Sequence, residues 1–150
     1  MNNNYFLIIV ALLTGALIPV QAALNNAFGK TVGTPVLTGL VVFMVAFFVT
    51  LAYLLITRAS FPPPADWLKA PWYSYLGGVT VATYVIVIIL VSPRLGIGNS
   101  IGLAVTGQII AAIIIDHFGL IHAQVRTMSA ARVLGALLMI VGIFLVMKKK

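Results

Sequence analysis

The chain has 150 residues, of which 62% are hydrophobic and only 7% are charged. A soluble domain is about 25% charged, so the composition excludes a soluble surface, and the high apolar content excludes intrinsic disorder. The absence of cysteine excludes disulfides and thiolate chemistry. The formal net charge is +7, but the cations are scattered over short connections and the C-terminal tail. This pattern indicates contacts with lipid headgroups and not with nucleic acid.

Five segments are long and apolar enough to span a bilayer, since a membrane helix needs about 20 mostly apolar residues. Only the last of them contains a charged residue, Arg132, close to its start. The sequence therefore predicts an all-α polytopic membrane protein, in which residues 1–150 form a single five-helix transmembrane domain. The predicted spans are residues 5–24, 35–56, 72–91, 97–115 and 129–147.

The predicted connections are short. Residues 25–33 form a polar loop after the first span, and residues 92–96 form a tight turn after the third. Residues 62–64 are all proline, which cannot continue a helix because it lacks the amide donor. The aromatic residues that follow are typical of a membrane-interface belt: Trp67, Trp72, Tyr73 and Tyr75. We expect the first span to be retained and not cleaved as a signal peptide, because no cation precedes it.

The charges flanking the spans determine orientation only weakly. One face carries four cations and the other carries five, whereas a clear excess of Lys and Arg normally sets topology. The first group is Arg58, Lys69, Arg126 and Arg132, and the second is Lys30, Arg94, Lys148, Lys149 and Lys150. We favour a homodimer of two oppositely inserted copies, which would form an inverted repeat. A single orientation, with a parallel dimer or another partner, is the alternative.

Uncharged polar residues inside the spans are the candidate substrate-binding groups, because such side chains tend to face protein or a water-filled cavity. Thr14 and Gln21 lie on one stripe of the first span beside Pro19, and Asn25 continues this stripe at the interface. We predict a cavity near the midplane lined by Thr14, Gln21, Tyr84, Asn99 and Gln108. Simple packing also explains Tyr84, and a hydrogen bond to another helix explains Gln108 equally well.

Small residues predict surfaces where helices pack closely. Gly98 and Gly102 have GxxxG spacing in the fourth span. Ala131, Gly135 and Gly142 fall on one stripe of the fifth span.

The few titratable residues predict no catalytic or metal centre. Asp116 is the only acid near a membrane-embedded position, which makes it a weak candidate for proton coupling. A pairing of Asp116 with Arg126 or Arg132 is the interpretation we favour. His117 and His122 have no second acid nearby, so we predict no metal and no cofactor, and no enzyme.

The chain resembles the short YdcZ-type branch of the drug/metabolite transporter superfamily, whose members are described as inner-membrane exporters. The resemblance covers nearly the whole chain and implies half of a ten-helix fold built from inverted repeats, located in the bacterial inner membrane. The strings that carry it are Pro19–Asn25, Leu76–Gly78, Pro93–Gly96, Gly107-Gln108, Asp116–Leu120 and Arg132–Gly135.

One departure limits what the resemblance implies. The small multidrug-resistance branch of the superfamily relies on a glutamate within its first helix, and this chain contains no glutamate. Proton antiport of that kind therefore does not carry over, and coupling would need Asp116 or transport would be uncoupled.

The predicted function is small-molecule transport or export by alternating access in a dimer. The sparse polar lining favours a neutral or weakly polar small molecule, or an amphipathic cation. The alternative is a non-transporting membrane subunit that binds a partner protein through its small-residue faces. A membrane-embedded enzyme or an ion channel has no supporting constellation of residues.

Overall fold

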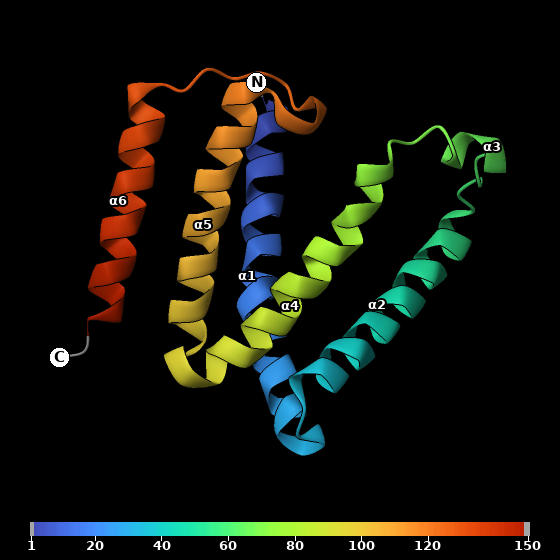
Figure 1. Cartoon of the computed structure of the whole chain (residues 1–150), viewed down its shortest axis with the longest axis horizontal. Coiled ribbons are helices and arrows are strands. Elements are labelled where there is room, and N and C mark those ends of the chain that lie inside the picture. Colours follow the sequence, from blue (N-terminus) through green and yellow to red (C-terminus); the bar gives the residue numbers. More distant parts are fainter. Residues whose placement is uncertain (1, 149–150) are drawn as a thin grey trace. The chain divides into compact units, whose positions relative to one another are not determined.

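The computed structural model describes residues 2–148, which belong to two compact units that meet in sequence at Arg94 and Leu95. All regular secondary structure in this part of the chain is helical (Figure 1). The first unit contains α1 (Asn2–Val32), α2 (Pro35–Thr57), α3 (Pro64–Trp67), the 3-10 turn η1 (Trp72–Tyr75) and α4 (Leu76–Leu95). The second contains α5 (Ile97–Phe118), the 3-10 turn η2 (Leu120–His122) and α6 (Ala130–Met147).

Five helices of the described chain, α1, α2, α4, α5 and α6, are long and apolar enough to cross a membrane. The predicted all-α, five-helix membrane fold is confirmed. The bounds of α2, α5 and α6 lie within three residues of the predicted spans. Ser129, predicted to open the last span, is instead its N-cap, and its Oγ accepts a hydrogen bond of 3.3 Å from the amide of Arg132.

The first helix is longer than the predicted span of residues 5–24. It has 31 residues and continues to Val32, so the predicted loop over residues 25–33 is wrong. A loss of apolar character does not end this helix; a residue in the left-handed conformation does. That residue is Gly33, whose φ is +77°, and Pro35 follows as the first residue of α2.

The predicted turn over residues 92–96 is also mostly helix. Ser92 to Leu95 complete α4, and the chain turns at Gly96 alone, where φ is +87°. Pro93 lies in the last turn of α4, where its missing N–H takes a helical partner from the carbonyl of Ile89, and only two residues of the helix follow it. At the other end, residues 72–75 form η1, so α4 itself starts at Leu76 and not at Trp72.

Close glycine contacts hold α1, α2 and α4 together at one end of the first unit (Figure 1). A Cβ added to Gly29 of α1 would lie 3.2 Å from Thr38 Oγ1 of α2 and 3.9 Å from Ile89 Cγ2 of α4. A Cβ on Gly39 of α2 would lie 3.2 Å from Ile86 Cγ1 of α4. Thr38 has no exposed surface. Larger side chains at these glycines would push the three helices apart.

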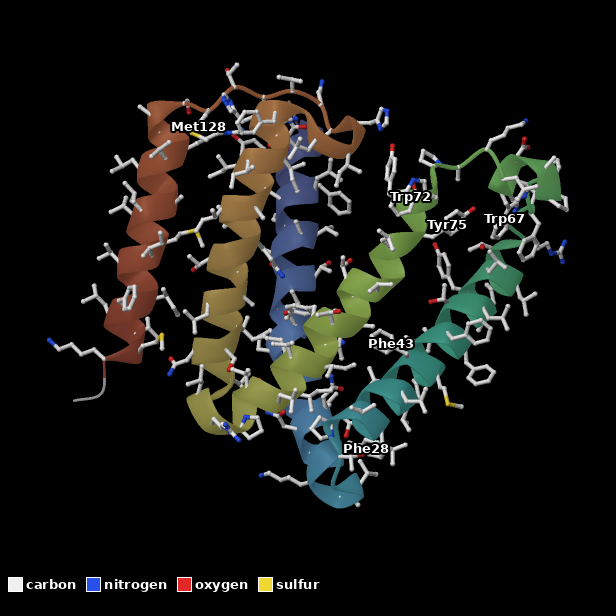
Figure 2. All side chains as sticks on the ribbon, viewed as in Figure 1. Phe28, Phe43, Trp67, Trp72, Tyr75 and Met128 are labelled. Carbon is white, nitrogen blue, oxygen red and sulfur yellow. The ribbon has the colours of Figure 1, made fainter. Side chains whose placement is uncertain are left out.

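The connection between α2 and α4 carries the predicted aromatic belt, and Figure 2 shows Trp67, Trp72 and Tyr75 along it. Tyr75 OH donates a hydrogen bond of 2.7 Å to the carbonyl of Trp67, and Trp67 Nε1 donates one of 3.3 Å to the carbonyl of Pro62. Lys69 forms an ion pair with Asp66. Exposed indole and phenol rings tied to the backbone in this way suit the headgroup level of a bilayer.

Gly33→Ala is expected to destabilise the protein by about 1–2 kcal/mol, because an L residue at positive φ brings its Cβ against the backbone. No atom lies within 4 Å of the added Cβ, so the loss would come from the backbone alone. The free energy of unfolding, measured by titrating the micelle-bound protein with SDS and following helicity by circular dichroism, checks this value.

Gly78→Ala is the matched control, since Gly78 lies inside α4 and also has no atom within 4 Å of an added Cβ. The same chemical change should there stabilise the protein by about 0.5–1 kcal/mol, because alanine is the better helix former. Equal effects of the two substitutions would contradict the left-handed assignment of Gly33.

Candidate functional site

The residues predicted to line a cavity are divided between the two units. Thr14 and Gln21 lie on α1 and Tyr84 on α4, whereas Asn99 and Gln108 lie on α5. The convergence of all five on one cavity therefore stays a prediction.

Two of the five donate a hydrogen bond to a backbone carbonyl four residues earlier in the chain. Thr14 Oγ1 donates to the carbonyl of Val10 at 2.8 Å, and Asn99 Nδ2 donates to the carbonyl of Leu95 at 2.9 Å. Such bonds to the preceding turn satisfy a polar side chain in an apolar medium without any ligand. The case for a substrate-binding role of Thr14 and Asn99 is therefore weaker than the sequence alone suggests.

The other three have no such partner. No hydrogen bond within residues 2–148 reaches the side chains of Gln21, Tyr84 and Gln108. Gln21 and Gln108 are exposed on their helices, and Tyr84 is half-buried. Gln108 lies near the middle of the 22-residue α5 and is not covered by α6. An unpaired amide at this depth costs several kcal/mol in hydrocarbon, so Gln108 needs a partner from outside its unit.

A proline within α1 adds a free backbone acceptor between Thr14 and Gln21. Pro19 has no N–H to donate to the carbonyl of Gly15, four residues earlier. No atom lies within 4 Å of a Cβ added to Gly15, so this face of α1 is open in the described chain. A free carbonyl in a membrane helix is tolerated where it lines a cavity or meets another polar group.

Asp116 lies at the junction of α5 and α6. Its Oδ2 is 3.5 Å from Arg132 Nη1, and the two side chains are 34% and 33% exposed. The backbone amide of Arg126 also donates to the carbonyl of Asp116 at 2.9 Å. The favoured pairing of this acid is therefore observed, with Arg132 as the partner of the carboxylate. A role of Asp116 in coupling stays a prediction.

His117 has a hydrogen bond and a ring contact within its own unit. His117 Nδ1 accepts a hydrogen bond of 3.2 Å from the amide of Met128, and its ring packs edge-to-face on Phe118 with centroids 4.8 Å apart. Across the described residues, no group of three or more His, Asp or Glu side chains is placed to hold a metal ion.

The glycines predicted to mediate packing differ in what they contact. A Cβ on Gly102 would overlap Ile143 Cδ1 and lie 3.3 Å from Ile143 Cγ1, so α5 meets α6 here. At Gly98, Gly135 and Gly142, no described atom lies within 4 Å of an added Cβ, and Ala131 is exposed. A packing role for these four residues would have to involve another helix surface, and it stays a prediction.

A pocket of about 170 Å³ lies where α1, α2 and α4 meet. Six of its lining residues are Asn26, Lys30, Gly33, Pro35, Ile89 and Pro93. Asn26 Oδ1 is buried and has no hydrogen-bond partner, and the same holds for the Oγ of Ser92, next to Pro93. Lys30 is exposed at this pocket, whereas Asn26 Oδ1 has almost no accessible surface.

The sequence prediction missed this pocket because it placed Asn26, Gly29, Lys30, Gly33 and Pro93 in loops. A signal was present: Ala22, Asn25, Asn26 and Gly29 follow the i, i+3, i+4, i+7 spacing of one helix face. Ala22 and Asn25 are indeed buried, with 3% and 7% of their surface exposed. The small and polar character of these residues concealed the helical repeat, which is usually sought in apolar side chains.

Comparison with known proteins identifies one family. The family model described as "Putative inner membrane exporter, YdcZ" matches residues 6–145, nearly the whole chain. The search of curated proteins gave no match, and neither did the search of solved structures.

Proposed function

Since this multi-pass inner-membrane protein belongs to the YdcZ family of inner-membrane exporters, we propose that it moves a small molecule across the membrane by alternating access in a homodimer. The family is one of exporters and not of enzymes. The residues proposed to contact the substrate are Gln21, Tyr84 and Gln108, with Thr14 and Asn99 as further lining groups.

Gln108 carries the proposal. Its amide lies midway along an apolar helix, is exposed, and has no hydrogen-bond partner among the described residues. A substrate or a second copy that supplies hydrogen bonds would remove a cost of several kcal/mol. An amide whose hydrogen bonds are made only while the substrate is present is suited to a transport site, which must both bind and release its substrate.

The chemistry of the lining restricts the substrate class. Within the five segments predicted from the sequence as spans, the polar groups are neutral amides and hydroxyls, and the one cation, Arg132, is already paired; Lys30 and Arg94 lie in the last turns of α1 and α4. Without a free charge, such a site favours a neutral or weakly polar molecule. Tyr84 additionally offers an aromatic face, which attracts an amphipathic cation.

We propose that the two copies insert in opposite orientations. The four-to-five distribution of cations between the faces supports this, because neither face has the excess that anchors one topology. Two opposed copies would form the inverted repeat from which many transporters build a midplane site. Reporters of each compartment, fused to the C-terminus, test the arrangement, and signal from one compartment only would contradict it.

The transport proposal is tested by reconstituting the full-length protein into liposomes loaded with a panel of neutral and cationic fluorescent dyes. Dye release is measured with and without an imposed pH gradient. We expect at least one dye to leave faster than from protein-free liposomes. Release that is no faster for any dye, together with stable binding of a second membrane protein, would favour the non-transporting subunit.

A further inference from the structure

Residues 123–129, here called the strap, connect η2 with α6 and have no regular secondary structure. Two backbone amides of the strap donate hydrogen bonds to the end of α5. The amide of Arg126 donates to the carbonyl of Asp116 at 2.9 Å, and the amide of Met128 donates to Nδ1 of His117 at 3.2 Å. An imidazole nitrogen is therefore part of what holds the strap in place.

The hydrogen bond from Met128 to His117 can exist in only one protonation state of the imidazole. Nδ1 accepts only while it carries no proton, because both ring nitrogens of an imidazolium are donors. The charge of a histidine ordinarily changes between pH 5 and 8. The bond from Arg126 to Asp116 joins two backbone groups and does not depend on pH. Acidification therefore removes one of the two bonds and leaves the other.

The turn before the strap is strained. Gly119, Ile121 and His122 have φ values of +60°, +55° and +60°. Positive φ is a marked outlier for a β-branched residue such as Ile121, because its Cβ crowds the backbone. Such a conformation persists only while the surrounding contacts hold it. The strain therefore favours movement of the strap once the bond to His117 is lost.

Met128 also lines an apolar groove of about 250 Å³ between α5 and α6, together with Ile114 and Val133. Figure 2 shows Met128 where the strap meets these two helices. The residue whose amide is bound by His117 thus places its own side chain at the groove. Release of the amide therefore frees the side chain to leave the groove.

We propose that the strap is a proton-sensitive lid on the groove between α5 and α6. While His117 is neutral, it binds the amide of Met128 and the lid is closed. When His117 takes up a proton, the amide is released and Met128 moves out of the groove. The lid belongs to this unit alone and operates whether or not the protein transports a substrate.

Other titratable and charged groups lie on the elements packed here: Asp116 on α5, Arg132 on α6, Arg126 on the strap and His122 on η2. Asp116 Oδ2 is 3.5 Å from Arg132 Nη1, so protonation of this acid would also alter the junction. A pH response of His117 must therefore be distinguished from one of Asp116 or His122 by substitution.

The test is hydrogen–deuterium exchange of the full-length protein in micelles at pH 8 and pH 5, with labelling times scaled to the intrinsic exchange rate at each pH. We expect the peptide that contains the Met128 amide to become about three- to tenfold less protected at pH 5, the range for one lost hydrogen bond. Helicity measured by circular dichroism should not change. Equal protection at both pH values would overturn the proposal, as would a general loss of helicity at pH 5.

Two substitutions of His117 should fix the lid in opposite states. His117→Asn supplies an amide oxygen that accepts a hydrogen bond but does not titrate, so the strap should stay protected at pH 5. His117→Phe keeps a ring without the acceptor, so the strap should be unprotected at both pH values. The first variant tests the proposal even if the second does not fold.

His122→Asn is the matched control, since asparagine tolerates the positive φ at this position. It should retain the full pH response of the unmodified protein. A response that persists in His117→Asn would overturn the proposal and assign the effect to Asp116 or His122.

The movement of the Met128 side chain is followed by NMR of protein labelled with ¹³C-methyl methionine. We expect the Met128 signal to shift between pH 8 and pH 5 in the unmodified protein but not in His117→Asn. Met44, exposed on α2 in the other unit, is the internal control and should not shift. A Met128 signal that stays constant while the strap loses protection would show that the groove remains covered, and would overturn the lid.

Discussion

Gln108→Leu is expected to lower the transport rate of the reconstituted protein about tenfold or more, because the substrate loses a hydrogen bond in an apolar site. The stability of the protein should be unchanged or slightly higher, since leucine suits apolar surroundings better than an unpaired amide does. The combination of impaired transport with preserved stability distinguishes a substrate contact from a structural one.

Dye release from liposomes and SDS-induced unfolding measure the two quantities on the same preparations. Thr50→Val is the matched control, since Thr50 is also an exposed polar residue within a span. Its Oγ1 donates to the carbonyl of Ala46 at 2.8 Å, so it already has a partner and should contribute nothing to transport. Gln108→Asn, which keeps the amide, should retain part of the activity.

Two results would contradict this interpretation of Gln108. Normal transport by Gln108→Leu would show that its amide does not contact the substrate. Loss of the dimer together with a lower free energy of unfolding would show that the amide joins helices instead.

Gly102→Leu is expected to destabilise the protein by about 2–3 kcal/mol, the upper range for overpacking a tight contact. The new Cβ would overlap Ile143 Cδ1, and Ile143 Cγ1, only 3.3 Å away, limits how far that side chain can yield. Helices α5 and α6 would then have to separate. SDS titration monitored by circular dichroism measures the loss.

Gly107→Leu adds the same atoms to the same helix at a position with no atom within 4 Å of the new Cβ. It should be neutral or stabilising by up to about 1 kcal/mol through helix propensity. Adding Ile143→Ala to Gly102→Leu should recover part of the lost stability, because it removes the side chain that clashes. A Gly102→Leu variant as stable as Gly107→Leu would show that α5 and α6 do not pack at this glycine.

Much of the fold could be predicted because the bilayer imposes a simple rule. A long apolar segment without charges is most stable inside the hydrocarbon core of the bilayer. Because no water is available there, all its backbone groups must be hydrogen-bonded within a helix. Five such segments in the sequence became five long helices. The pairing of Asp116 with Arg132 could also be predicted from the sequence, because few other charged residues are available to pair with either one.

Helix ends were predicted less well, because hydropathy reports the medium around a residue and not its backbone conformation. Asn25 to Val32 are mostly polar or small and yet helical, and Ser92 to Leu95 continue α4 through a proline. The pocket followed from those corrections, since Asn26 and Pro93 line it only when both segments are helical.

The amino-acid sequence by itself determined that this protein resides in a lipid bilayer, how many times it spans that bilayer, its family and the class of its function. Only the tertiary structure decided which polar groups already have partners: Thr14 and Asn99 donate to backbone carbonyls four residues earlier, whereas Gln108 and the buried Oδ1 of Asn26 have no partner among residues 2–148. The reason is physical. Transfer into lipid depends on composition along the chain, but hydrogen bonding depends on distances of about 3 Å that arise only after the helices have formed and packed.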